Sequence, residues 1–316
     1  MKAIMQNEFG NEQTLYLGDI EIPVLSQDEV LIKLSYVGIG QWDIFEREGG
    51  YEKLLNLNSK FPYILGSEGV GEIIKVGNEV THYKIGDIVN AVKFLNKKGG
   101  FYAEYVIIPV DFIYKKPEYL SIDQSSSISG VGLTAFRGII DVLQAKNDDD
   151  ILIFGASGGV GHIAVQIAQS LGANVYAVAS GTDGVEAIKK LGIKYVVDGK
   201  ARSSEECMSS FNINHFDKAF YTAGGNLAND LSKYVKQEGT IVYPNGIDEI
   251  DSSLCLARIQ SYYADIDTSL IKDFSEWVNK NKPKVYIEKV FDMDEFILAH
   301  KMLTEHYVGK LCFKLK

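Results

Sequence analysis

A glycine-rich segment between Asp150 and Leu171 constrains the fold of this 316-residue chain more than any other feature. A short apolar run at 151–154 leads into glycines spaced through residues 155–161. Apolar residues then recur at every fourth position from Ile163 onward, which predicts one face of a helix. The whole segment therefore predicts a strand, a tight turn and a helix. This arrangement points backbone N–H groups and a helix N-terminus at a phosphate.

Three interpretations of the turn compete. Ala156, Gly158 and Gly161 match the alanine-first form of the dinucleotide fingerprint. In that motif, Gly158 lets the backbone approach a pyrophosphate and Gly161 lets the helix pack closely on the sheet. The Gly-x-Ser-x-Gly pattern around Ser157 also matches the nucleophile elbow of serine hydrolases. The third interpretation is a turn that merely connects a strand to a helix. A nucleotide-triphosphate loop is disfavoured, because no Lys-Ser/Thr pair follows the glycines.

The order of the other elements favours the dinucleotide interpretation. Short strands punctuated by Gly and Pro up to about Pro117 predict an antiparallel, barrel-like domain. Strands and helices alternate from Ile151 to Tyr243, which predicts a doubly wound parallel sheet. The glycine turn thus opens the first βα unit, where a dinucleotide site belongs, whereas a nucleophile elbow lies in the middle of such a sheet. Near Asp265 the chain leaves this alternating pattern.

Composition narrows the class of protein. The net charge of −10 and the pI near 5.1 argue against a nucleic-acid-binding surface. No apolar run approaches the roughly 18 residues of a membrane span, and the first residues lack the apolar core of a signal peptide. We therefore expect a cytoplasmic protein without nucleic-acid or membrane partners. Cys207, Cys255 and Cys312 are widely spaced and predict neither a disulfide framework nor a metal site.

The end of the second strand of the sheet indicates which dinucleotide is bound. NAD-binding sheets place an Asp or Glu there, which accepts hydrogen bonds from the ribose hydroxyls. This chain has Ala179 at that position, followed by Ser180. A carboxylate would repel a 2′-phosphate, whereas a small hydroxyl residue can donate to it. The sequence therefore favours NADP over NAD, although no Arg or Lys follows at once.

With both halves considered, the chain resembles the medium-chain dehydrogenase/reductase superfamily, and within it the zinc-free quinone oxidoreductase family related to zeta-crystallin. The segments that carry the resemblance are Leu65–Val89, Gly99–Pro109, Gly132–Ala135, Phe154–Gly161 and Val308–Leu311. The resemblance implies an α/β fold, in which a Rossmann doubly wound parallel sheet (122–265) is inserted into a GroES-like β-barrel domain. That second domain is formed by residues 1–121 and 266–316, and the active site is expected in the cleft.

The chain departs from the zinc-dependent members of the superfamily. Those members use a Cys, a His and a second Cys as catalytic ligands, and the matching segments here carry Gly40 and Ser67 and lack the third ligand. The four-cysteine structural zinc lobe is also missing. Because zinc needs thiolate or imidazole ligands at fixed geometry, we expect no metal site. Asp43 and Glu68 match polar residues that surround the metal in zinc relatives, and a hydrogen-bonded core carboxylate is an equally open interpretation.

The resemblance implies hydride transfer from NADPH to a quinone or an α,β-unsaturated carbonyl. Tyr51 lies in a segment that resembles the family's Arg-x-Gly-x-Tyr stretch beside the nicotinamide. It is the candidate catalytic residue, which orients or protonates the substrate, and an aromatic wall residue is the alternative. The family often has Asn and Tyr where this chain has Gly40 and Phe45, so a more apolar pocket for a hydrophobic acceptor is expected. Trp42, Phe45 and Tyr51 are candidates to line its pocket.

The candidate cofactor-binding residues lie in the glycine turn, at ends of parallel strands, or in segments that resemble cofactor contacts of the family. They are Thr134, Ala156, Ser157, Gly158, Gly159, Val160, Gly161, Ser180, Gly224, Asn245, Gly246 and Lys310. The resemblance places Thr134 beside the nicotinamide. Lys310 lies in a segment that resembles one near the adenosine phosphate in the family. It either supplies the positive charge that is missing after Ser180 or is an ordinary surface residue.

The resemblance also implies a homodimer, paired through the edge of the Rossmann sheet near Ile259–Ile266. Two other functions stay open at this point. One is an alcohol or aldehyde reductase of the same fold, and the other is a cofactor-binding protein without catalysis.

Overall fold

The computed structural model describes residues 1–200 and 202–315. It divides into two compact units, each described here by itself. The first unit contains Met1–Gly130, Ile266–Lys280 and the chain from Ile287 onward, and the second contains Val131–Asp265 and Asn281–Tyr286. Within the described residues, no helix has both the length and the apolar character that crossing a membrane requires.

These bounds differ from the predicted domain limits in two places. Helix α3 (Ile122–Ser126) belongs to the first unit, because it packs against strands β3 (Glu29–Ile39) and β5 (Glu68–Val76). Residues 281–286 belong to the second unit. There the side-chain amide of Gln166 donates to the carbonyl of Lys284 and accepts from its N–H, at 2.9 and 2.8 Å.

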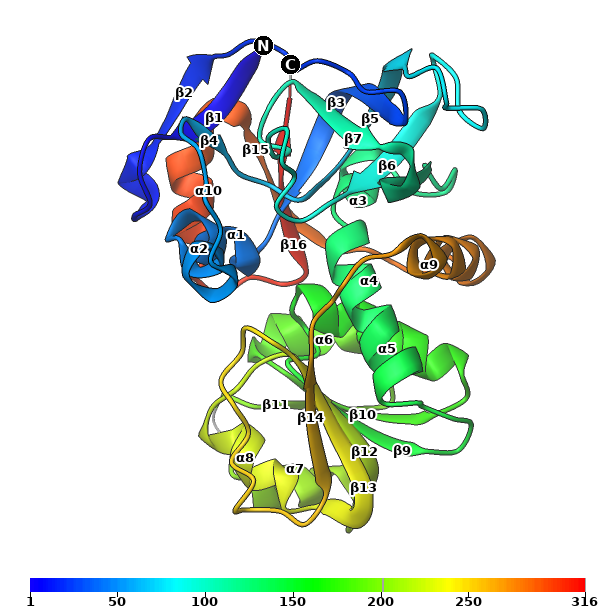
Figure 1. Ribbon diagram of the computed structural model, residues 1–316. Helices are drawn as coiled ribbons and strands as arrows, with labels where there is room; N and C mark the ends of the chain where they lie inside the picture. The colour runs from blue at the N-terminus through cyan, green and yellow to red at the C-terminus, as the bar shows by residue number, and fades with distance from the viewer. Residues whose placement is uncertain (201, 316) are drawn as a thin grey trace. The chain divides into compact units, whose positions relative to one another are not determined.

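The first unit is built on two sheets of mostly antiparallel strands (Figure 1). The larger sheet has the order β15-β16-β3-β5-β6-β8, with β7 paired to β3 off this path, and the smaller has the order β2-β1-β4. The remaining strands are β1 (Lys2–Gln6), β2 (Leu15–Asp19), β4 (Tyr63–Ile64), β6 (Ile88–Val92), β7 (Tyr105–Pro109), β8 (Ile113–Lys115), β15 (Ile287–Asp292) and β16 (Lys310–Lys314). The helices of this unit are α1 (Gln41–Arg47), α2 (Gly50–Leu55), α3 and α10 (Phe296–Met302), and α9 (Thr268–Asn281) lies in it but for its last residue.

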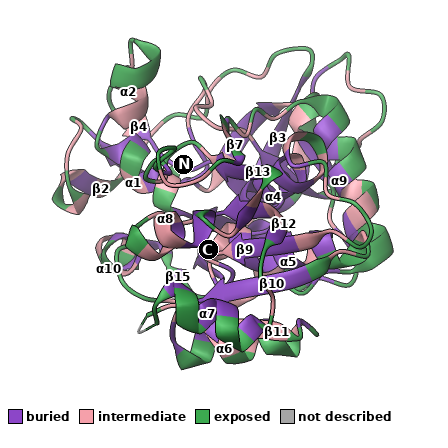
Figure 2. Ribbon diagram, turned by 90° about the horizontal axis from the view of Figure 1, so that it is seen from below, coloured by how far each residue is buried: buried purple, intermediate pink, exposed green. Residues whose placement is uncertain are grey.

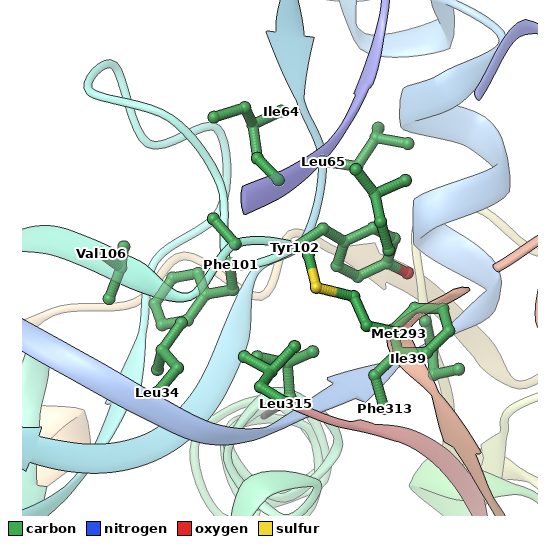
Figure 3. Packing of buried hydrophobic residues seen from close by; sticks show 14 of the residues in the cluster. Leu34, Ile39, Ile64, Leu65, Phe101, Tyr102, Val106, Met293, Phe313 and Leu315 are labelled. Carbon is green, nitrogen blue, oxygen red and sulfur yellow. The ribbon is translucent and has the colours of Figure 1, made fainter. Parts of the chain in front are cut away.

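One apolar core ties both ends of the chain into the first unit. Phe101 and Tyr102 lie at its centre with Met293, Phe313 and Leu315 from the C-terminal segment (Figure 3). The ring of Tyr102 meets that of Phe313 edge to face, with centroids 5.2 Å apart. Because apolar burial stabilises by about 25 cal/mol per Å², this shared core explains why the C-terminal strand returns to the N-terminal domain.

The second unit is a six-stranded parallel sheet with the order β11-β10-β9-β12-β13-β14. Its strands are β9 (Asp150–Phe154), β10 (Asn174–Ala179), β11 (Tyr195–Asp198), β12 (Phe216–Tyr221), β13 (Val235–Pro244) and β14 (Arg258–Tyr262). The connecting helices are α5 (Gly159–Ser170), α6 (Gly181–Lys190), α7 (Ser204–Phe211) and α8 (Asn226–Ser232). Helix α4 (Ser129–Phe136) continues into a π-helical stretch, Arg137–Val142, before β9.

Strand β10 is buried along nearly its whole length, whereas α6 and α7 show buried and exposed sides (Figure 2). The strand order reverses at β9, which has β10 on one side and β12 on the other. Ligands of doubly wound sheets bind beyond the carboxyl ends of the strands at such a switch point. The predicted fold class, a Rossmann sheet combined with a GroES-like domain, is confirmed.

Candidate active site

The glycine turn follows β9 at the switch point of the second unit. Gly155 adopts a φ of +78°, which favours glycine, and the N–H groups of Gly155 and Ala156 both donate to the carbonyl of Val178, at 3.0 and 2.9 Å. Gly158 is the N-cap of α5, and no side chain caps the helix there. The first N–H groups of α5, those of Gly159 and Val160, therefore have no helical acceptor and suit a phosphate.

Gly158 and Gly161 differ in the space around them. A Cβ on Gly161 would lie 2.1 Å from the carbonyl oxygen of Gly155 and 2.8 Å from the Cα of Ala156. A Cβ on Gly158 would meet only that same carbonyl oxygen, at 3.4 Å. Gly161 is therefore required for the close approach of helix and turn, whereas Gly158 leaves open space at the helix N-terminus.

Ser157 ties the turn to the neighbouring strand. Its side chain is almost fully buried, and its Oγ accepts the N–H of Ser180 at 3.0 Å. Gly184 of α6 packs against it, since a Cβ at that position would lie 2.8 Å from the Oγ. The hydroxyl thus serves as an acceptor that joins the predicted residues Ser157 and Ser180. This geometry favours a structural role beside the phosphate site over that of an elbow nucleophile.

A carboxylate that sequence reasoning missed stands next to Ala179. Strands β10 and β11 pair Ala179 with Asp198. The Oδ1 of Asp198 accepts the N–H groups of Gly181 and Lys200, at 2.9 and 3.0 Å, and so fixes the turn after Ser180. The dinucleotide motif predicts an acidic residue only at the end of the second strand. Asp198 lies on the next strand, β11, and comes beside Ala179 only through strand pairing, so no sequence pattern indicated it.

The other predicted cofactor residues of the second unit lie where the later strands end or in α4. Gly224 follows β12, and a Cβ there would lie 2.5 Å from the Cβ of Asp248. Asn245 and Gly246 follow β13, and the N–H of Asn245 donates to the carbonyl of Tyr262 at 2.8 Å. Thr134 is nearly buried in α4, and its carbonyl accepts the hydroxyl of Tyr262 at 2.7 Å.

The loop after β12 is also tied directly to the glycine turn. Thr222 Oγ1 donates toward the carbonyls of Phe154 and Gly155, at 3.0 Å each. The loops after β9, β12 and β13 therefore lie at one edge of the sheet, as parallel strands require.

In the first unit, Tyr51 lies in α2 beside buried acids. Its ring meets that of Phe45 edge to face, with centroids 4.8 Å apart. Burial, together with the nearby carboxyls of Glu46 and Asp43, raises the pKa of Tyr51 above its ordinary value. A tyrosine hydroxyl is protonated at neutral pH even without this shift, so Tyr51 can donate a hydrogen bond.

Sequence reasoning found Asp43 but missed the network around it. Asp43 Oδ2 accepts the N–H of Gly40 at 2.7 Å and the hydroxyl of Tyr102 at 3.0 Å, and Glu46 Oε1 accepts the hydroxyl of Tyr63 at 2.6 Å. Burial raises the pKa of Asp43 to about 7. Burial, followed by the proximity of Asp43, raises that of Glu46 to about 8. The carboxyls thus carry protons over part of the neutral range.

Lys310 differs from both of its predicted roles. Its side chain is 2% exposed, so the interpretation as ordinary surface is wrong. The ammonium lies 3.0 Å from Oε1 of Glu68 and donates to the carbonyl of Ile39 at 2.7 Å. Because its charge is committed to Glu68 inside the first unit, Lys310 is not among the phosphate contacts proposed below. The sequence signal that could have shown this is the apolar run Leu311–Phe313, which predicts a buried strand.

The residues at the positions of the superfamily's zinc ligands do not fit that metal. Gly40 has no side chain that could ligate a metal, and Ser67 offers only a buried hydroxyl. Across residues 1–200 and 202–315, no three or more His, Cys, Asp or Glu side chains are grouped so as to hold a metal ion. Zinc sites of this kind require thiolate or imidazole ligands.

Comparison with known proteins agrees with this architecture. Residues 26–118 match the family model described as the alcohol dehydrogenase GroES-like domain, and residues 159–259 match that described as zinc-binding dehydrogenase. The chain is 31% identical to the quinone oxidoreductase of Mus musculus, over 98% of this chain and 96% of that protein. It is 32% identical to the alcohol dehydrogenase of Geobacillus stearothermophilus, where the match covers 63% of this chain and only 64% of that protein. The solved structure of the quinone oxidoreductase from Coxiella burnetii superposes with a TM-score of 0.86 at 28% identity, covering 100% of this chain and 99% of that one.

Proposed function

Because the chain belongs to the quinone oxidoreductase-like family of the medium-chain dehydrogenase/reductase superfamily, we propose that it is a zinc-independent NADPH-dependent oxidoreductase. The acceptor in this proposal is a small hydrophobic quinone or α,β-unsaturated carbonyl. Membership of an oxidoreductase family with a nucleotide-binding dehydrogenase fold is the firm part of the statement. The cofactor preference, the acceptor and the independence from zinc are the proposed parts.

The observation that carries the proposal is the geometry of the glycine turn. The N–H groups of Gly155 and Ala156 hold the turn on β10. The N-terminus of α5 at Gly158, in contrast, has no side-chain cap and open space around it. A pyrophosphate is the ligand that such a turn accommodates at the switch point of a doubly wound sheet. We propose that the N–H groups of Ser157, Gly159 and Val160 bind it. The loops that carry Gly224, Asn245 and Gly246 and the helix that carries Thr134 are proposed to hold the rest of the cofactor.

The chemistry proposed for the first unit is hydrogen bonding to the acceptor. A bound nicotinamide cofactor supplies the hydride. The hydroxyl of Tyr51 is protonated at neutral pH, as that of any tyrosine is, so it can donate to the oxygen on which negative charge develops. Quinones and enones are already electron-poor and need no Lewis acid, which agrees with the poor fit of the zinc positions.

Turnover tests the proposal. We expect the purified protein to oxidise NADPH with members of a quinone and enone panel. Tyr51→Phe should lower kcat at least tenfold and leave the Kd for NADPH unchanged. Tyr16→Phe is a matched control, since it removes another hydroxyl of the first unit, one that bonds only Asn7. Equal activity of the wild type and Tyr51→Phe would remove Tyr51 from the mechanism.

The coenzyme preference is tested separately. We expect NADPH to bind more tightly than NADH, because Ala179 presents no carboxylate to the 2′-phosphate and Ser180 presents a hydroxyl. Ala179→Asp should reduce the NADPH-to-NADH affinity ratio at least tenfold. Asp198→Asn is the control: its carboxylate already accepts two N–H groups, so the ratio should change little. A wild-type preference for NADH that Asp198→Asn abolishes would assign the ribose contact to Asp198 instead.

Two alternatives give different results in the same assays. Turnover of simple aldehydes or alcohols without quinone or enone activity would identify an alcohol or aldehyde reductase, which the similarity to the Geobacillus enzyme favours. Tight NADPH binding without turnover of any acceptor would identify a cofactor-binding protein.

We also propose a cytoplasmic homodimer. Strand β14 is the outermost strand of the parallel sheet and pairs only with β13 among the described strands, so its other edge offers unpaired backbone groups. A monomeric mass in solution would exclude the dimer.

A further inference from the structure

Glu68 is a fully buried carboxylate with a specific set of neighbours. Its side chain is 0% exposed, and its Oε2 accepts the N–H of Gly130 at 2.8 Å. Its Oε1 lies 3.0 Å from the ammonium of Lys310. Gly38 makes room for it, since a Cβ there would lie 2.6 Å from Oε1. Because a buried carboxylate is costly unless it is paired, the neighbouring cation of Lys310 offsets the cost of burying Glu68.

The ammonium of Lys310 is buried and has two further contacts in the first unit. Besides Glu68, it donates to the carbonyl of Ile39 at 2.7 Å and lies over the ring of Trp42, 4.2 Å from the centroid. Cation–π contacts of this kind are strongest over tryptophan and away from water. The ion pair, the hydrogen bond and the ring contact together hold the charge in the interior, where the side chain is 2% exposed.

The indole of Trp42 lies where ligand side chains would have to project. A Cβ on Gly40 would meet the indole at 2.6 Å, and a Cβ on Gly130 would meet it at 3.2 Å and the carboxyl carbon of Glu68 at 3.4 Å. Gly40 stands at one zinc-ligand position of the superfamily, and Gly130 lies in the segment that carries another. The space next to these positions is therefore filled with indole.

We infer that Trp42 closes the space that the metal occupies in the zinc-dependent relatives: its indole lies where ligand side chains would project, and the Glu68–Lys310 pair beside it is balanced without a metal. This inference rests on the proposed function only in its zinc independence. An ammonium has no vacant orbital for an oxygen lone pair, so Lys310 balances charge in the site without acting as a Lewis acid. Polarisation of the acceptor then falls to other donors.

A double-mutant cycle on the cofactor-free protein tests the charge pair. Lys310→Met should raise the unfolding equilibrium constant at least a hundredfold, because it leaves Glu68 buried without a counter-charge. Glu68→Gln in the same protein should recover at least tenfold of that loss. Independent, additive effects of the two substitutions on the unfolding equilibrium would overturn the inference.

Fluorescence reports the contact of the indole with the cation. The chain has two tryptophans, so Trp277→Phe leaves Trp42 as the sole emitter. In that background, Lys310→Met should shift the emission maximum, whereas Lys314→Met, at an exposed position of the same strand, should not. An unchanged spectrum in the Lys310→Met protein would contradict the assigned contact.

Cobalt binding tests the metal directly. The wild-type protein titrated with Co²⁺ should develop no tetrahedral absorption, and one tightly bound equivalent would overturn the inference. None of these measurements uses NADPH or an acceptor. Failure of the inference is therefore distinguishable from failure of the proposed activity, which is judged by turnover alone.

Discussion

Substitution by Ala should have different effects at two glycines of the glycine turn: it should lower stability at Gly161 and weaken NADPH binding at Gly158. In Gly161→Ala, the added Cβ meets backbone atoms at 2.1 and 2.8 Å, which no side-chain rotation relieves. Overpacking of this kind costs about 1–3 kcal/mol, and the better helix propensity of Ala offsets about 1 kcal/mol. Because rigid backbone places the contact at the upper end of that range, we expect a net loss of about 2 kcal/mol. For a unit of this size, that lowers Tm by about 4–8 °C.

Gly158→Ala should leave stability nearly unchanged. Its Cβ meets only one oxygen, at 3.4 Å, and Gly158 has a φ of −76°, which Ala adopts freely. The methyl group would instead occupy the uncrowded space at the N-terminus of α5 that we assign to the pyrophosphate. We expect the Kd for NADPH to rise at least tenfold, which corresponds to about 1.4 kcal/mol.

Thermal unfolding and NADPH titration of both variants measure the two effects. The expected pattern is a lowered Tm for Gly161→Ala, and a normal Tm with weak cofactor binding for Gly158→Ala. The packing argument fails if Gly161→Ala melts with the wild type. A Gly158→Ala protein that binds NADPH normally would show that the cofactor does not approach this glycine.

Three further results are expected. Between about pH 5 and 8, stability should fall as pH rises, because folded Asp43 and Glu46, with pKa values of about 7 and 8, still hold protons that the unfolded chain has released; the Asp43→Asn, Glu46→Gln double variant should flatten this slope in urea unfolding, and an unchanged slope would refute the assignment. Tyr262→Phe should cost about 1 kcal/mol, because it removes the buried hydrogen bond from the Tyr262 hydroxyl to the carbonyl of Thr134, and it should weaken NADPH binding, because we assign that part of α4 to the cofactor; calorimetry and titration of one sample measure both. Ser157→Ala should retain most NADPH binding, because the Ser157 hydroxyl accepts the N–H of Ser180. Cleavage of a chromogenic ester should be the same in the variant and the wild type, whereas an elbow serine would be indispensable for it.

Local patterns in the sequence were enough to predict the fold of the second unit. The glycines around Gly158, the apolar period of α5 and the alternation of strands and helices predict the turn, its place at the first βα unit and the parallel sheet. Each of these depends on residues within about one helix length of each other, so sequence spacing alone carries the information. The replacement of zinc-ligand residues at Gly40 and Ser67 could likewise be read directly from the chain.

The tertiary structure decided which distant residues meet. Lys310 donates to Ile39 across 271 positions of the sequence, and strand pairing sets Asp198 beside Ala179. No local pattern specifies these partners. A lysine or aspartate looks the same in the sequence whether its side chain is buried or exposed, and only tertiary packing determines which groups surround that side chain. The sequence alone therefore predicts that Gly40 and Ser67 cannot ligate zinc. The fold is what brings Lys310, Trp42 and Glu68 together next to those positions, where burial requires that charge be balanced.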